Sequence, residues 1–159
     1  SAGMISDRVA GPIFEKGGEF VHGFTYSGHP VSCAVALENI KIIEDEKLVD
    51  KVANETGPYL KKRWQEFESH PIVGEVRNVG LLGAIELVEN KEKRQFFPKE
   101  KKVGDACRNF CFENNLVMRA LKDTMVVSPP LTMTVEQIDE MYDLVKLCLD
   151  LTAEKFGIK

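Results

Sequence analysis

Residues 20–35, FVHGFTYSGHPVSCAV, combine a glycine-punctuated loop that carries two aliphatic hydroxyl side chains with the start of an apolar helix pattern. Thr25 and Ser27 lie in the loop, and Pro30 precedes small apolar residues. Proline suits the first helical position, because its missing N–H would have no partner there. A loop of this kind offers hydroxyl and backbone N–H donors to an anion. The loop is therefore a candidate phosphate site with Thr25 as a contact. The alternative is a threonine that only bonds to nearby backbone.

Arg119 is the second side chain whose position suggests chemistry. It lies in the apolar run 116–121, which predicts a strand on which Arg119 shares a face with Val117 and Leu121. A guanidinium on an apolar face needs an anionic partner to offset its desolvation. That partner is either a substrate carboxylate, bound through two parallel hydrogen bonds, or Asp123 across the following turn.

The histidines and cysteines suggest structural roles. His22 and His29 flank the loop, and the sequence pattern does not by itself match either to a carboxylate or a cysteine, so we expect packing or capping rather than catalysis. Cys107 and Cys111 are one helical turn apart, but no second pair of ligands accompanies them, so no metal site is expected. Three of the four cysteines fall in apolar helical patterns, where cysteine acts as a small hydrophobic residue.

Composition limits the class of protein. The chain has 159 residues, of which 43% are hydrophobic and 29% charged, as is typical of a soluble globular protein with a real core. The net charge of -4 argues against a nucleic-acid surface, which needs a clustered basic face. No apolar run approaches the roughly 18 residues that cross a bilayer, and the N-terminus lacks a signal-peptide layout. We expect a reduced, cytoplasmic protein that binds neither nucleic acid nor membrane.

Hydrophobic spacing predicts the elements that position these residues. Helices are expected at about 7–15, 31–43, 48–67 and 103–114, and a last helix opens with a capping box of Thr134 and Gln137. Gly57-Pro58 is expected to kink the third helix. Strands are expected over 73–88 and in a hairpin over 116–128, and Ala2–Ile5 is a candidate strand end. The charged stretch 90–102, with Phe96-Phe97 in its middle, is predicted to be a solvated loop with an aromatic anchor; the alternative is a binding patch.

This order of elements predicts an α/β fold of the α+β kind, in which a mixed or antiparallel sheet is covered by helices.

Four segments, in order, resemble class III aminotransferases, which depend on pyridoxal phosphate. SAGMISDRVA resembles the strand and helix after the catalytic lysine of that family, and HGFTYSGHPVSCAVAL resembles its phosphate loop and the next helix. VRNVGLLGAIEL resembles the first strand of its small domain, and NLVMRALKDTMVVSPPLTMT its carboxylate-binding hairpin. The subgroup with the strongest resemblance is the ω-transaminases, which pair an amine or ω-amino acid with a keto acid such as pyruvate.

The resemblance implies a fold-type I homodimer with its active site at the subunit interface. Residues 1–45 would be the end of the large cofactor-binding domain, and residues 46–159 the C-terminal small domain. Thr25 would donate to the cofactor phosphate in the partner subunit's site, Phe24 would line that site, and Arg119 would bind the substrate carboxylate. The family often has glycine before the turn aspartate, where this chain has Lys122.

The resemblance also implies that the chain is the C-terminal part of such an enzyme. No lysine here matches the one that holds the cofactor as a Schiff base. We therefore expect no catalytic residue in this chain and no transaminase activity from it alone. Aminomutase and decarboxylase chemistry on the same cofactor stay open. The alternative class is a non-catalytic binding or interaction domain with the small-domain fold.

Overall fold

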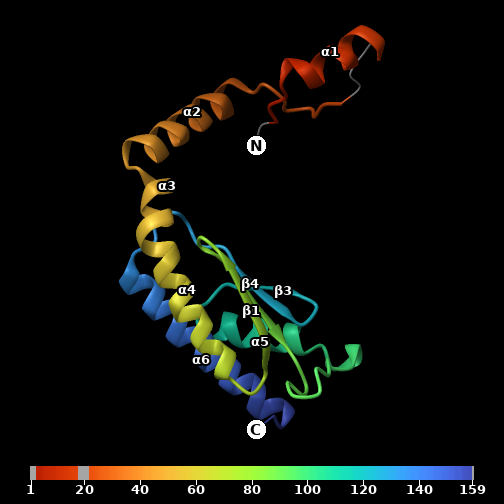
Figure 1. The fold of residues 1–159 in the computed structure, drawn as a ribbon, viewed down its shortest axis with the longest axis vertical. Coiled ribbons are helices and arrows are strands. Elements are labelled where there is room, and N and C mark those ends of the chain that lie inside the picture. Colours follow the sequence, from red (N-terminus) through yellow and green to blue (C-terminus); the bar gives the residue numbers. More distant parts are fainter. Residues whose placement is uncertain (1–2, 18–21, 159) are drawn as a thin grey trace. The chain divides into compact units, whose positions relative to one another are not determined.

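The computed structural model describes residues 3–17 and 22–158 of the chain. Contacts divide the chain into two compact units, Ser1–Lys41 and Ile42–Lys159. Figure 1 shows their helices and strands, coloured along the sequence. The division into domains at residues 45 and 46 concerns a larger fold and stays a prediction.

Among its described residues, the first unit contains helices and no strand. Helix α1 spans Asp7–Lys16, and α2 begins at Pro30 and runs on to Asp45, across the boundary between the units. Both predicted helices are confirmed. The predicted strand is wrong for residues 3–5, which are irregular and exposed, because no described strand is there to pair with them; Ala2 lies outside the described residues. Gly18 and residues 20–21 of the loop motif also lie outside them.

The second unit begins with a broken helical rod. Helix α3 spans Leu48–Lys51, a π-helical turn η1 spans Val52–Thr56, α4 spans Gly57–Glu66, and a 3-10 turn η2 spans Phe67–Ser69. The interruption expected at Gly57-Pro58 is confirmed. Pro58 has no N–H to donate to the preceding turn, and the backbone widens so that Gly57 N–H bonds to Val52 O, five residues back.

Four antiparallel strands form the sheet. They are β1 (Val73–Val79), β2 (Leu82–Leu87), β3 (Arg119–Leu121) and β4 (Thr124–Val127), in the spatial order β1-β2-β4-β3. The strand and hairpin predictions are confirmed. The predicted strand over 116–121 is shorter at its start, because Leu116 N–H bonds to Cys111 O at the end of the preceding helix rather than to a strand.

The two faces of the sheet differ in burial. Val76, Ile85 and Met125 lie side by side across β1, β2 and β4 and belong to the core. The next row across the sheet, Arg77, Ala84, Val126 and Arg119, points to the opposite side, because successive side chains alternate. We call this second side the outer face; its side chains are exposed or half-buried.

Helices cover the buried face (Figure 1). Helix α4 packs on β1, α5 (Val103–Glu113) packs on β3 and β4, and α6 (Val135–Phe156) packs on both α4 and α5. Trp64 of α4 is buried and donates from Nε1 to Ala84 O at 3.2 Å. The predicted capping box is present at the start of α6, where Thr134 and Gln137 exchange side-chain-to-backbone hydrogen bonds.

The charged loop between β2 and α5 has a single aromatic anchor. Phe97 is buried in the core, whereas Phe96 is 62% exposed. A short 3-10 turn, η3, spans Lys99–Lys101 and leads into α5. The predicted solvated loop is confirmed, with Phe97 rather than both phenylalanines as its anchor.

The hairpin turn between β3 and β4 is held on the first turn of α5. Gly104 N–H donates to Asp123 Oδ1 at 2.9 Å, and Leu87 N–H donates to Asp123 O at 2.8 Å. A β-carbon added to Gly104 would lie 1.9 Å from Lys122 O. Only glycine therefore permits this approach of helix and turn.

We predict that Gly104→Ala destabilises the second unit by about 2 kcal/mol, because the methyl group meets backbone and separates Gly104 from Asp123. Gly11→Ala in α1 is the matched control, since a β-carbon there meets no atom within 4 Å. Urea unfolding of both variants, followed by Trp64 fluorescence, measures the difference. Equal midpoints for Gly104→Ala and the unsubstituted chain would contradict the close approach.

Candidate functional site

The loop before α2 is organised by its own hydrogen bonds. Phe24 N–H donates to Ser27 Oγ at 3.1 Å, and Ser27 N–H donates to Phe24 O at 2.9 Å. Gly28 follows with a φ of +72°, a conformation that glycine adopts without strain. These contacts fix a tight turn between Phe24 and the start of α2.

Thr25 lies at the exposed tip of this turn. Among the described residues, neither its hydroxyl nor its backbone N–H makes a hydrogen bond, so the backbone-bonding alternative is not what the structure shows. Phe24 is 75% exposed, and its ring meets the His22 ring edge-on at 5.4 Å. No carboxylate occurs in residues 22–37. The donors, the absence of acidic side chains and the adjoining start of a 16-residue helix fit a phosphate group.

His29 caps the helix that follows. Its Nδ1 accepts from Ser32 N–H at 3.4 Å, and its carbonyl accepts from Cys33 N–H at 3.0 Å. The predicted capping role of His29 is confirmed. This contact occupies Nδ1 of His29, whereas the Thr25 hydroxyl has no described hydrogen-bond partner.

Arg119 begins β3, the edge strand next to β4, and points to the outer face. Its neighbour Met118 is buried, whereas Val117 and Leu121 are exposed. Arg119 itself is exposed, so the burial that would demand an acidic partner is absent. The arginine is thus available to an anionic ligand.

The alternative pairing of Arg119 with Asp123 is wrong. No described acidic side chain forms an ion pair with Arg119, and Asp123 Oδ1 instead accepts from Gly104 N–H. Sequence reasoning saw Asp123 only as a partner for Arg119. The contact that forms joins Gly104, the second residue of α5, to Asp123 in the hairpin turn. A glycine at the start of a helix pattern was the sequence feature that pointed to a close approach.

Lys122 lies in the two-residue turn between β3 and β4. Its φ is +56°, in the left-handed region that L-residues disfavour. The backbone is therefore strained locally at the position where the pattern that the hairpin resembles often has glycine.

The predicted site residues lie in different units. Phe24 and Thr25 belong to the first unit and Arg119 to the second. The structure describes the phosphate loop and the arginine hairpin separately, and the binding roles of these three residues stay predictions.

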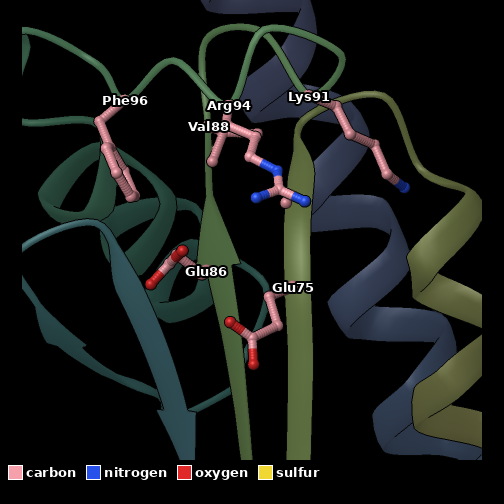
Figure 2. Close-up of a pocket in the computed structure, with 7 residues that line it drawn as sticks. Glu75, Glu86, Val88, Lys91, Arg94 and Phe96 are labelled. Carbon is pink, nitrogen blue, oxygen red and sulfur yellow. The ribbon is translucent and has the colours of Figure 1, made fainter.

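A cavity of about 330 Å³ lies on the outer face, beneath the loop that follows β2. Figure 2 shows Glu75 and Glu86 on neighbouring strands and Arg94 extending toward them from the loop. The two carboxylates lie opposite each other, and Arg77 offsets their repulsion from 3.1 Å and 3.9 Å. None of the predicted site residues lines this cavity.

The cysteines of the second unit are part of its core. Cys107, Cys111 and Cys148 are buried where α5 meets α6, whereas Cys33 is exposed on α2. The neighbouring Cys107 and Cys148 thiols, together with burial, raise the pKa of Cys111, so this thiol stays protonated. Within the described residues, no three histidine, cysteine, aspartate or glutamate side chains are grouped to hold a metal ion. The same part of the chain contains no helix of the length and apolarity that a membrane crossing requires.

Comparisons with known proteins give one consistent result. The model of the family "Aminotransferase class-III" matches residues 2–149. The chain is 57% identical over 150 residues to a putrescine–pyruvate aminotransferase of Pseudomonas aeruginosa, covering 94% of this chain and 32% of that protein. It is 41% identical over 141 residues to gamma aminobutyrate transaminase 1 of Solanum lycopersicum, covering 87% of this chain and 27% of that protein.

Solved structures agree with these relatives. An (S)-enantioselective ω-transaminase from Thermomicrobium roseum superposes with a TM-score of 0.83 at 36% identity, over 93% of this chain and 33% of that one. A PMP-bound aminotransferase from Vibrio fluvialis superposes with a TM-score of 0.82 at 34% identity, over 95% of this chain and 33% of that one. The predicted α/β fold is confirmed.

The chain spans about a third of the length of these relatives. The resemblance deduced from four short segments is confirmed over nearly its whole extent. The chain belongs to the class III aminotransferases, a family that depends on pyridoxal phosphate.

Proposed function

We propose that this chain is the C-terminal part of a pyridoxal-phosphate-dependent aminotransferase that moves an amino group between an aliphatic amine or ω-amino acid and a keto acid such as pyruvate. The observation that carries the proposal is the family match over residues 2–149, together with 57% identity to a putrescine–pyruvate aminotransferase. When bound, the cofactor supplies an electron sink for the amine carbon. The residues of this chain bind and orient the cofactor phosphate and the substrate carboxylate.

The phosphate loop holds the anionic end of the cofactor in this proposal. Thr25 contributes a hydroxyl and its backbone N–H, both without another partner in the described structure. Donors of this kind bind a phosphate strongly where water is excluded. Phe24 supplies an apolar wall beside them.

Arg119 binds the substrate carboxylate. A planar guanidinium at the edge of the sheet can meet both carboxylate oxygens at once. An uncharged amine substituent needs no such partner, and Arg119 can then point into solvent, because no described acid holds it.

Exposed apolar surface favours an enzyme part over an independent binding domain. Helices α1 and α2 bury no side chain in the described chain. Large apolar side chains of α2 are exposed on several sides, among them Val31, Val35, Leu37 and Ile40. A helix that is apolar all round is normally covered. We propose that the rest of the large domain and a second subunit cover it, in a cytoplasmic homodimer whose active site lies at the interface.

The experiment that tests the function compares the 159-residue chain with the full-length protein. We expect the full-length protein to bind pyridoxal phosphate and to form alanine from pyruvate with putrescine or 4-aminobutyrate as donor. We expect no turnover from the short chain, because no matching lysine is present in it. Turnover by the short chain would refute the proposal, as would a full-length protein that takes up no cofactor.

Thr25→Val in the full-length protein should weaken cofactor retention about tenfold, since a hydrogen bond to the charged phosphate is lost while the shape is kept. Thr25→Ser keeps the hydroxyl and is the control. Dialysis followed by absorbance of the remaining cofactor measures retention. Equal retention by all three proteins would remove Thr25 from the phosphate site.

Arg119→Ala should raise the KM for pyruvate about a hundredfold and leave butanal, an uncharged acceptor, nearly unaffected. The matched control is Arg77→Ala, because Arg77 lies in the same row of the outer face, paired with Glu75. Initial rates with both acceptors give the comparison. Equal losses on pyruvate and butanal would contradict the carboxylate role.

A further inference from the structure

We infer that Asp123 is a positioning residue for Arg119: its carboxylate fixes the β3–β4 hairpin on helix α5 and so sets where the guanidinium stands. The inference rests on the proposed carboxylate role of Arg119. It adds a residue that touches neither substrate nor cofactor in that proposal.

The strand that carries Arg119 makes few stabilising contacts within the sheet. β3 contains three residues and pairs only with β4 among the described strands. The side chains of Arg119 and Leu121 are exposed. Burial therefore anchors β3 mainly on one side, through Met118, and leaves the turn end to be fixed by other contacts.

Asp123 supplies contacts at that end in two directions. Its side chain accepts from Gly104 N–H on α5 at 2.9 Å, and its backbone carbonyl accepts from Leu87 N–H on β2 at 2.8 Å. Gly104 lies in the first turn of α5, where backbone N–H groups lack partners within the helix. The residue that precedes α5 is Lys102, whose side chain makes no capping hydrogen bond. Asp123 thus does from a distant turn what an N-cap residue does locally.

The backbones of α5 and the hairpin turn are in direct contact at Gly104. An added β-carbon on Gly104 would lie 1.9 Å from Lys122 O, so helix and turn already touch through their backbones. The backbone of Lys122 in this turn has a left-handed φ of +56°. Asp123 lies in the two-residue turn between β3 and β4 and is only four residues from Arg119, so loss of the anchor is transmitted directly to the strand of Arg119.

The test uses the full-length protein with Asp123→Ala, Asp123→Asn and the control Asp105→Ala. Asp105 is an acid in the same first turn of α5, but it forms an ion pair with Arg108, and no hydrogen bond of the described residues joins it to the hairpin. We expect Asp123→Ala to lower the preference for pyruvate over butanal about tenfold, with the loss in KM for pyruvate rather than in kcat. Asp123→Asn keeps an acceptor oxygen and should stay within about threefold of the unsubstituted protein. Asp105→Ala should leave the preference unchanged.

A second readout does not depend on turnover. Hydrogen exchange at the Gly104 amide should be about tenfold faster in Asp123→Ala and unchanged in Asp105→Ala. If Asp123→Ala does not fold, Asp123→Ser replaces it, since its hydroxyl is one bond too short for the 2.9 Å contact. A preference that shifts equally in the Asp105 and Asp123 variants overturns the inference, as does faster Gly104 exchange with the preference intact.

Failure of the proposed function is distinguishable from failure of the inference. If Arg119→Ala leaves the preference between pyruvate and butanal unchanged, the role of Arg119 is wrong. If Arg119→Ala changes it and Asp123→Ala does not, Arg119 keeps its role and the positioning by Asp123 is wrong.

Discussion

The alternation of side chains along four antiparallel strands is the constraint on which the second unit depends. Ile85, Met125 and their neighbours must all point to the side covered by α4, α5 and α6, because a four-stranded sheet is stable only with one face buried. The next residue on each strand is then directed to the outer face. Arg119 is available to a ligand because Ala120 and Met118, on either side of it, are used by the core. A register shift of one residue would bury the arginine and expose the core.

The two parts of the candidate site are built by different physical means. The loop around Thr25 gets its shape from local hydrogen bonds between Phe24 and Ser27 and from the helix start at Pro30. The hairpin of Arg119 gets its position from contacts between residues far apart in sequence, such as Gly104 with Asp123. A loop of the first kind can form from a short segment alone, whereas the hairpin is held in its position only when α5 and β2 are in place.

This difference explains how much the sequence could predict. Helix boundaries, the hairpin and the Thr134 capping box follow from local patterns, and they were predicted within a few residues. The interruption near Gly57-Pro58 was expected, but its π-helical form was not, because it depends on how the backbone accommodates Pro58. The partner of Asp123 was missed, since a hydrogen bond over 19 residues leaves no periodic signal. The segment at residues 3–5 was a candidate strand end from its apolar composition and its resemblance, and neither supplies the neighbour that a strand requires.

The edge position of β3 has a consequence for the free energy of local opening. A strand of three residues with one neighbour loses few hydrogen bonds when it separates from the sheet, whereas β2 and β4 each have neighbours on both sides. Local openings of a protein range in free energy from near zero at its margins to the full unfolding value in its core. The segment that carries Arg119 therefore belongs to the part of the unit that opens at low cost, while α6 and the central strands stay closed. Local opening of this segment does not require the rest of the unit to unfold, and the hydrogen bonds at the end of the hairpin oppose it.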